Sequence, residues 1–338
     1  MPLSSRAEPG QGGPALGRAF AAAAAAAADP WLARHLGPVL ARYALDGGCG
    51  VSGLNHDGSP LQLCLGLRAD RAGWRVILDP ALGPGPAQLR HDRARRALAR
   101  DLAAQGAAGA WPEFDRLLAD CGPDAALPAA DFAHGAFWVG AEIGGPGRAI
   151  YVDAAARPAA EGWARAATAF RACAAAEGEI GPTLAALADV AVPSSVGIEV
   201  RGGQRRLKLH CRLRAAPPQG ALAAALPMLA DSRLLSAVAA LMQGGPGLSL
   251  HGFVIEAAFD AETGLLGDAK LDLAMPELWP PAVALHRSRA AAAALGVNWP
   301  DTSVARLSGF ARLSYVGIGR GADGQTRLNL YFKPAPPP

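Results

Sequence analysis

The sequence has little cysteine, few aromatic residues and almost no net charge. Five cysteines are scattered along 338 residues without a CxxC pair, so neither a disulfide framework nor a zinc site is indicated. The net charge of +3 is too small for bulk attraction to nucleic acid or to an anionic membrane surface. We therefore expect no nucleic-acid or membrane partner, a reduced cytoplasmic setting, and a basic site only where cations gather locally.

A long hydrophobic run is also missing. No stretch of about 18 strongly apolar residues is present, so no transmembrane helix is expected. The alanine run at 21–28 follows a leader without a basic cluster, which is unlike a signal peptide. We predict a disordered, Ala-rich leader over 1–30 with a short helix ending at Asp29-Pro30, one barrel domain over 31–334, and a disordered tail over 335–338.

Five segments have the pattern of a β-hairpin, two strands separated by a turn signal. They are residues 60–80, 136–154, 194–213, 250–275 and 307–334. The stretches between them have helical character, and they are residues 86–120, 157–190, 217–243 and 280–296. The first strands of the second, third and fourth hairpins read VGAEI, VGIEV and FVIEA. Regular spacing with this echo predicts repetition of one ββα unit.

The stretch QRRLKLHCRL at 204–213 shows what the second strands have in common. Its leucines and Cys211 fall on one face of a strand, and Arg206, Lys208, His210 and Arg212 fall on the other. The opposite faces of the five second strands carry mostly cations and aromatic residues: Arg75; Tyr151; Arg206, Lys208 and His210; Lys270 and Asp272; Arg327, Asn329 and Tyr331. A solvent face would mix in Glu, Thr and Ser, so this bias favours a lumen.

Ten antiparallel strands with helices between the hairpins fit two α+β architectures. One is an open sheet whose polar face meets water. The other is a closed ten-stranded β-barrel with the helices outside and the polar faces lining the lumen. The cation-rich faces favour the closed barrel.

Three segments together resemble the dimethylallyltryptophan synthase group of aromatic prenyltransferases, the ABBA superfamily. They are DGSPLQLCLGLRADRAGWRVILDP (57–80), RRLKLH (205–210) and LSYVGIGRGADGQTRLNLYFKP (313–334). The order and spacing of the segments carry the resemblance, which spans roughly residues 50–334. The resemblance implies a ten-stranded antiparallel αββα barrel.

The resemblance also implies transfer of an allylic group from a prenyl diphosphate to an electron-rich aromatic acceptor. The acceptor would be of the indole or tryptophan type, free or within a peptide. Dimethylallyl or geranyl diphosphate would be the co-substrate, Mg²⁺ would be optional, and no cofactor would be tightly bound. Lys and Arg side chains stabilise a departing diphosphate, and tyrosine rings stabilise the carbocation that remains.

Carried over residue by residue, the resemblance assigns three roles. The residues expected to bind diphosphate are Arg75, Arg206, Lys208, Lys270 and Arg327. The residues expected to shield the carbocation are Tyr151, His210, Tyr315 and Tyr331. The residue expected to bind the acceptor is Gln62.

The chain departs from the family pattern at several positions. Gln62 stands where the family has an acceptor-binding glutamate, and His210 and Asp272 stand where it has shield tyrosines. The lysine of the second hairpin has no clear equivalent, because Arg148 or Ala149 would have to serve. An acid near a diphosphate, such as Asp272, would require a metal or the acceptor to engage it.

Candidate catalytic bases share the inward parity of the strands. Glu142, Glu199 and Glu256 occupy matching positions, so one of them is expected to remove a proton from the alkylated ring while the others pair with lumen cations. His210 is a candidate proton shuttle. We take Glu142, Glu199 and His210 as the catalytic candidates, and we identify no metal ligands.

Two other functions fit the same residues. The chain could be a catalytically degenerate barrel that binds an anionic or isoprenoid ligand, as the departures at Gln62, His210 and Asp272 suggest. It could instead be an α+β enzyme with an open sheet and a different site. The expected partner is a small-molecule or peptide acceptor, and the chain is expected to be a monomer or homodimer.

Overall fold

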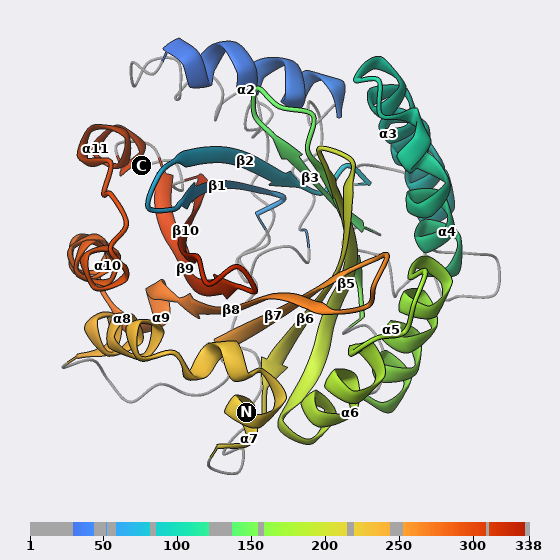
Figure 1. Cartoon of the computed structure of the whole chain (residues 1–338). Helices are drawn as coiled ribbons and strands as arrows, with labels where there is room; N and C mark the ends of the chain where they lie inside the picture. The colour runs from blue at the N-terminus through green and yellow to red at the C-terminus, as the bar shows by residue number, and fades with distance from the viewer. Residues whose placement is uncertain are drawn as a thin grey trace.

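Ten antiparallel strands close into one barrel in the computed structural model of the chain (Figure 1). The structure describes residues 30–43, 52, 59–81, 86–121, 137–154, 159–214, 220–243, 253–308 and 311–334. Residues 1–29 of the predicted 1–30 leader, with its short helix, and the predicted tail lie outside these residues, whereas Pro30 is the first residue of a helix.

Each strand is bonded to its neighbours in the sequence, and β1 pairs with β10 to close the ring. The strands of the first three hairpins are β1 (Leu61–Leu67), β2 (Ala72–Leu78), β3 (Phe137–Glu142), β4 (Arg148–Asp153), β5 (Ala191–Arg201) and β6 (Gln204–Leu213). The strands of the last two are β7 (Phe253–Asp260), β8 (Leu266–Ala274), β9 (Ala311–Gly321) and β10 (Thr326–Pro334). The closed barrel and the five hairpins are confirmed, and the open sheet is wrong.

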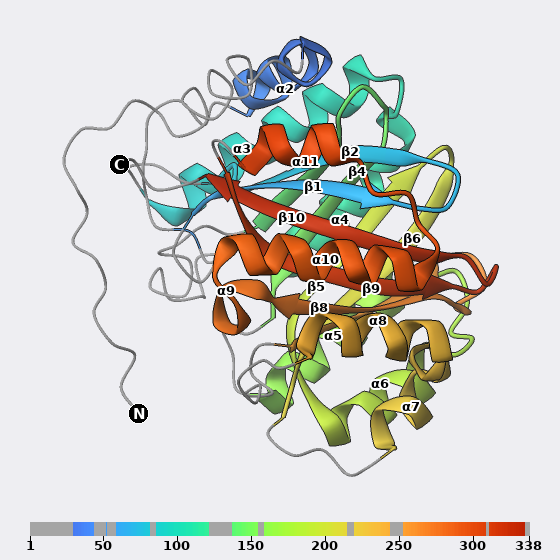
Figure 2. The ribbon, with the colours of Figure 1, turned by 90° about the vertical axis from the view of Figure 1, so that its left-hand side faces the viewer.

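Helices surround the outside of the barrel (Figures 1 and 2). They are α2 (Pro30–Arg42), α3 (Ala87–Ala104), α4 (Trp111–Cys121), α5 (Ala159–Cys173), α6 (Ile180–Val190), α7 (Ala221–Ala225), α8 (Ser232–Met242), α9 (Met275–Leu278), α10 (Pro281–Leu295) and α11 (Asp301–Ser308), with short 3-10 turns η1 (Ala108–Ala110) and η3 (Pro227–Ala230). The four predicted helical stretches contain helices, whereas α2, α9 and α11 were not expected. None of the described helices is long and apolar enough to span a membrane.

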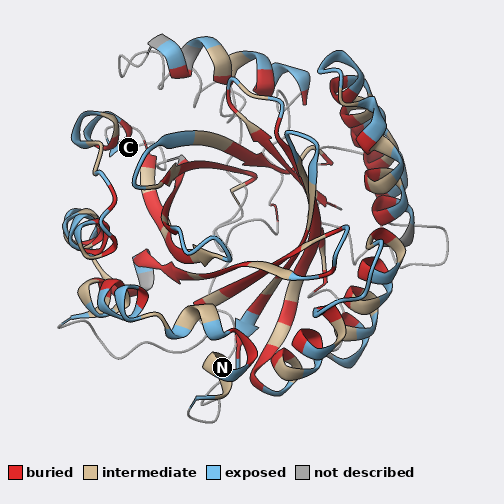
Figure 3. Ribbon diagram, in the orientation of Figure 1, coloured by how far each residue is buried: buried red, intermediate tan, exposed pale blue. Residues whose placement is uncertain are grey.

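The hydrophobic core lies between the helices and the outer face of the barrel. Side chains such as Val76, Ile150, Leu207 and Leu328 point outward from their strands and are at most 1% exposed. Figure 3 shows this burial along the strands. Fully burying one such side chain stabilises the fold by about 1.5 to 3 kcal/mol. Because successive strand residues alternate, packing this outer face aims the intervening polar side chains into the lumen.

A buried carboxylate joins α2, α3 and β4. Asp101 on α3 accepts hydrogen bonds from Arg148 Nε at 2.7 Å, from Tyr43 Oη at 2.7 Å, and from Arg42. Arg148 also donates to the carbonyls of Gly145 and Gly147 in the turn after β3. The side chain of Arg148 is therefore committed to this contact, and Asp101 fixes one rim of the barrel.

Replacing this carboxylate is expected to destabilise the fold strongly. Asp101→Ala leaves the buried guanidinium of Arg148 without its ion-pair partner, which costs about 3 to 5 kcal/mol. The matched control is Asp115→Ala, because Asp115 on α4 pairs with Arg95 at the surface, where an ion pair contributes about 1 kcal/mol or less. Urea unfolding measures both, and equal losses in the two variants would contradict the prediction.

Candidate functional site

The barrel encloses two cavities that meet inside the lumen. The large chamber has a volume of about 760 Å³ and lies toward the β1–β2, β5–β6 and β9–β10 turns. The small chamber has a volume of about 270 Å³ and is lined by residues toward the opposite ends of the strands. Arg75 and Glu256 line both chambers, so these two side chains stand at the boundary.

Basic side chains dominate the wall of the large chamber. They are Arg68, Arg71, Arg75, Arg148, Arg201, Arg206, Lys208 and Arg327, against the acidic residues Glu142, Glu199, Glu256 and Asp323. Among them, Arg148 is held by Asp101, so it supplies no free charge for a ligand. The remaining excess of positive charge makes this chamber suited to an anion.

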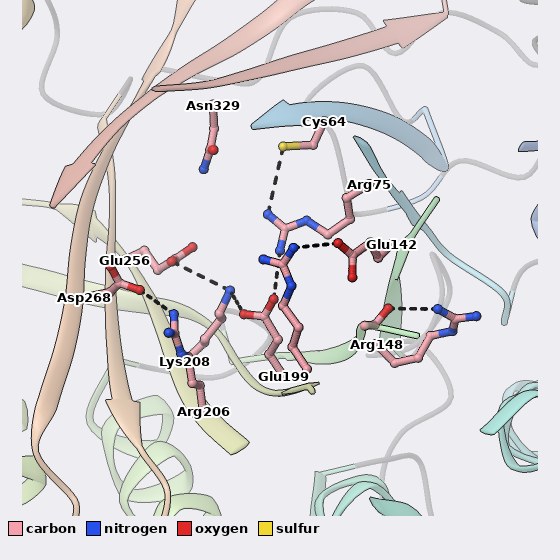
Figure 4. Close-up of polar contacts among 12 residues, drawn as sticks. Cys64, Arg75, Glu142, Arg148, Glu199, Arg206, Lys208, Glu256, Asp268 and Asn329 are labelled. Atoms are coloured by element: carbon pink, nitrogen blue, oxygen red, sulfur yellow. Dashed lines mark hydrogen bonds and ion pairs between the residues drawn. The ribbon is translucent and has the colours of Figure 1, made fainter. Parts of the chain in front are cut away.

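The cations on the floor of the large chamber share carboxylate partners (Figure 4). Glu199 on β5 lies 2.5 Å from Lys208 Nζ and 3.4 Å from Arg75 Nη1. Asp268 on β8 lies 2.7 Å from Arg206 Nη1 and 3.0 Å from Arg327 Nη1. Each of these carboxylates therefore bridges two cations that come from different strands.

Glu256 on β7 connects these pairs into one network. Its carboxylate lies 2.9 Å from Lys270, 3.1 Å from Arg327, 3.0 Å from His210 and 3.9 Å from Lys208. The structure thus brings together all five cations that the sequence analysis selected for diphosphate binding. Four of them line the large chamber, whereas Lys270 lines the small one. Their binding role stays a prediction.

The network favours the charged forms of Glu199, Glu256 and Lys208. Burial raises the pKa of Glu199, but the charges of Lys208 and Arg75 outweigh burial and hold this pKa at about 2. Burial acts in the same way on Glu256, where Lys208, Lys270, the His210 hydrogen bond and Arg327 bring the pKa well below its usual value. Burial lowers the pKa of Lys208, and Glu199 and Glu256 more than offset this, so the pKa is raised. Charged partners thus compensate one another inside the barrel.

The small chamber brings aromatic side chains together with polar and charged ones. Tyr331, Cys64 and Ile77 form a buried cluster inside the barrel, with Trp138 and Tyr315 packed against it. Tyr331 Oη accepts a hydrogen bond of 2.6 Å from Lys270 Nζ, which also lies 5.0 Å from the centre of the ring. All four predicted shield residues, Tyr151, His210, Tyr315 and Tyr331, line this chamber, and their role stays a prediction.

His210 lies between three neighbours. Its Nε2 is 3.0 Å from Glu256 Oε2, its Nδ1 is 3.2 Å from Ser195 Oγ, and its ring packs edge-on against Tyr151 at a centroid distance of 5.4 Å. Gly197 on β5 leaves room for this arrangement, because a Cβ there would lie 2.6 Å from the ring of Tyr151. The imidazole therefore has a defined orientation in the small chamber.

The remaining predicted residues occupy separate places. Gln62 is buried in the small chamber and donates to Ser314 Oγ at 3.2 Å. Glu142 lies on the wall of the large chamber and pairs with Arg201 at 2.6 Å. Asp272 pairs with Lys270 at 2.8 Å, so a protein cation engages this acid, whereas we expected a metal or the acceptor to do so.

Several lumen residues escaped the sequence analysis. Arg68 and Arg71 flank the β1–β2 turn, and neither side chain has a hydrogen-bond or ion-pair partner among the described residues. Burial and the nearby charge of Arg327 lower the pKa of Arg68. Asp268 lies on the same face of β8 as Lys270, and Trp138 lies on the same face of β3 as Glu142. Counting alternate residues along these two strands would have found both.

No metal site is formed by the described part of the chain. No group of three or more His, Cys, Asp or Glu side chains is placed there to hold a metal ion.

The acid sensitivity of the protein is expected to depend on Glu199. Because the pKa of Glu199 is lower in the folded protein than its ordinary value of 4.5, this carboxylate stabilises the fold above that pH. The contribution is lost as the pH falls from 4.5 toward about 2. Glu199→Gln should lower stability at neutral pH by about 3 kcal/mol, because Lys208 loses its nearest counter-charge.

The variant should also lose less additional stability than the wild type between about pH 5 and about pH 3. Urea unfolding at a series of pH values measures this difference. Glu142→Gln is the control, because Glu142 pairs with the exposed Arg201, and it should keep the wild-type pH profile. The prediction is wrong if Glu199→Gln and the wild type lose stability in parallel on acidification.

The comparisons with known proteins agree with this architecture. No family model matches the sequence, and no curated protein matches it. Among solved structures, 5-dimethylallyl tryptophan synthase from Streptomyces coelicolor, in complex with DMASPP and Trp, is 15% identical with a TM-score of 0.75. The match covers 95% of this chain and 96% of that chain.

Two further solved structures show the same likeness. The binary complex of PriB with product diphosphate is 16% identical with a TM-score of 0.73, over 94% of this chain and 95% of that chain. The 6-dimethylallyltryptophan synthase from Micromonospora olivasterospora is 13% identical with a TM-score of 0.71, over 96% of this chain and 100% of that chain. The chain therefore has the ten-stranded αββα-barrel fold of the ABBA aromatic prenyltransferases.

Proposed function

We propose that the protein transfers an allylic prenyl group from a prenyl diphosphate to an electron-rich aromatic acceptor. The observation that carries the proposal is the division of one lumen into a cation-rich chamber and an adjoining chamber that contains three tyrosines and a tryptophan. Prenyl transfer separates a diphosphate anion from an allylic cation, so it requires these two environments side by side. The solved structures that share the fold include prenyltransferase complexes, which supports the proposal.

The large chamber would hold the diphosphate. Its volume of about 760 Å³ is within the usual range for ligand pockets. Lys208, Arg75, Arg206 and Arg327 would donate charge-assisted hydrogen bonds to the phosphate oxygens, and Arg68 and Arg71 would add donors from the β1–β2 turn. Lys270 would act from the small chamber. Because these charges are preorganised in a buried site, they would favour departure of the diphosphate.

The small chamber would hold the allylic cation and the acceptor ring. Tyr151, Tyr315 and Tyr331 would stabilise the cation through their ring faces and keep water away from it. The acceptor we propose is an indole, free or within a peptide, held near Gln62. A neutral amide at Gln62 would orient the acceptor by a hydrogen bond without adding charge.

A second candidate function is binding of an anionic isoprenoid without turnover. The observation that favours it is the pairing of Lys208, Lys270 and Arg327 with buried carboxylates, which a ligand must displace. Mg²⁺ would lower the cost of such displacement by neutralising part of the diphosphate charge. Turnover assays separate the two candidates, because only a transferase forms product. They are run with and without Mg²⁺ so that a need for the ion is not mistaken for inactivity.

Incubation with donor and acceptor is expected to yield a prenylated aromatic product. Dimethylallyl and geranyl diphosphate are each paired with tryptophan, tyrosine, simple indoles and Trp-containing peptides, with Mg²⁺ or with EDTA. Mass spectrometry should show an acceptor whose mass has increased by one prenyl group. Donor binding without product from any acceptor would instead support the binding function, and absence of both would contradict the two candidates together.

Removing one lumen cation is expected to weaken binding of the diphosphate group. Lys208→Met deletes a buried charge-assisted hydrogen bond, so the Kd for dimethylallyl thiolodiphosphate should rise about 10- to 100-fold in calorimetric titrations. Arg205→Met is the matched control, because Arg205 lies on the same strand but pairs with Glu113 and Glu262, away from the ion-pair network. Equal weakening in both variants would show that the lumen does not bind the diphosphate.

A further inference from the structure

Three neighbouring strands place Ser195, His210 and Glu256 in one row across the small chamber. Ser195 on β5 is the cross-strand partner of His210 on β6, and His210 is the partner of Glu256 on β7. The row is hydrogen-bonded throughout, with Ser195 Oγ 3.2 Å from His210 Nδ1 and His210 Nε2 3.0 Å from Glu256 Oε2. All three residues line the small chamber, which is where the acceptor ring would lie.

The charges around Glu256 decide the direction of these hydrogen bonds. Lys208, Lys270 and Arg327 surround the Glu256 carboxylate and keep it ionised, so it can only accept a hydrogen bond. His210 Nε2 therefore carries a hydrogen and donates it to Glu256. In the neutral imidazole, Nδ1 then has a free lone pair, which accepts a hydrogen bond from the hydroxyl of Ser195.

The other catalytic candidates are poorly suited to accept a proton from a ring. Burial raises the pKa of Glu199, but the charges of Lys208 and Arg75 outweigh burial and hold this pKa at about 2. The carboxylate of Glu199 is therefore a weak base. Glu142 lies on the wall of the large chamber and pairs with Arg201. His210 is the candidate that lies within the small chamber and has a lone pair directed at the hydroxyl of Ser195.

We propose that Ser195, His210 and Glu256 form a proton relay that removes the ring proton of the alkylated acceptor. This inference rests on the proposed prenyl transfer. Both ring nitrogens of His210 have partners, so Ser195 is the group that contacts the substrate. His210 receives the proton through Ser195, and Glu256 is a positioning residue that fixes the tautomer of His210.

The relay completes a balanced substitution. The allylic C–O bond of the donor breaks and its electron pair leaves with the diphosphate, while a ring carbon of the acceptor bonds to the allylic carbon. The C–H bond at that ring carbon then breaks, and its electron pair restores the aromatic ring. Ser195 Oγ takes the ring proton as its own hydroxyl proton passes to His210 Nδ1. The resulting imidazolium is stabilised by the carboxylate of Glu256 and returns the proton to water after product release.

Two variants separate a relay from a shield. His210→Phe keeps an aromatic ring beside Tyr151 but cannot accept a proton, and Ser195→Ala removes only the contact hydroxyl. Ser308→Ala is the control, because Ser308 is an exposed serine on α11, outside the barrel, and its hydroxyl donates to the main-chain carbonyl of Ala305. The assay uses the full chain, dimethylallyl diphosphate and the acceptor panel in ring-protonated and ring-deuterated forms.

Loss of the relay is expected to make proton removal slow. The kcat of His210→Phe should fall about 100-fold, and the kcat of Ser195→Ala should also fall. Both variants should gain a primary deuterium isotope effect on kcat. The alkylated ring would then revert to the cation, so an isotopic oxygen label at the bridging position of the donor should scramble faster than product forms. The control should match the wild type in all three measurements.

The possible failures are distinguishable. If the wild type forms no product with any acceptor, the proposed function is wrong and the relay is wrong with it. If the wild type is active but His210→Phe keeps its kcat, or loses kcat without an isotope effect or label scrambling, prenyl transfer stands and the relay is overturned. His210 would then serve only as a shield. Ser195→Ala provides the same decision should His210→Phe fail to fold.

Discussion

The lumen depends on the compensation of buried charge around Glu256. Taking an ion out of water costs several kcal/mol, and an unpaired charge inside the barrel would not be tolerated. Glu256 meets this constraint for four basic side chains at once, because Lys208, Lys270, His210 and Arg327 all reach its carboxylate. The same constraint defines what a ligand must do. An anion that enters the large chamber has to replace carboxylate contacts with equally good ones, and a diphosphate offers several oxygens in the right charge state.

The position of Glu256 at the boundary of the two chambers links binding to chemistry. On one side its partners are Lys208 and Arg327 of the large chamber, and on the other side they are His210 and Lys270 of the small chamber. A diphosphate that draws Lys208 and Arg327 toward itself would leave the Glu256 carboxylate less neutralised. This carboxylate would then interact more strongly with His210. Donor binding would in this way strengthen the base in the small chamber. Glycines make the packing feasible, since a Cβ on Gly317 would overlap the carboxylate of Asp272 and lie 3.0 Å from Lys270.

The strand faces were readable from the sequence because a strand has a period of two. Alternation along Arg206, Lys208 and His210 was enough to place these side chains together in a lumen once the barrel was closed. The register of that hairpin could also have been predicted from its turn. Gly202 and Gly203 have positive φ values of 56° and 80°, as a two-residue hairpin turn requires, and this turn sets Ser195 opposite His210. Ser195 was overlooked because a serine carries neither charge nor an aromatic ring.

Other features had no local signal. The pairing of His210 with Glu256 joins strands that are separated in the chain by α7 and α8, so no turn specifies its register. Gly37 and Pro38 interrupt the helical pattern of α2, whose attachment through Asp101 depends on tertiary contacts. Arg148 borders the large chamber, but its bond to Asp101 commits its guanidinium to the rim of the barrel, so it does not serve as a lumen cation. Long-range partners of this kind follow from closure of the barrel.

A crystal structure of the full chain with dimethylallyl thiolodiphosphate tests the central claim most directly. The account predicts that phosphate oxygens lie within hydrogen-bonding distance of Lys208, Arg75 and Arg327, that the carboxylate of Glu199 has moved away from Lys208, and that the allylic carbon points toward Tyr331 in the small chamber. A diphosphate group bound outside the barrel, with the ion pairs around Glu256 and Glu199 unchanged, would contradict it.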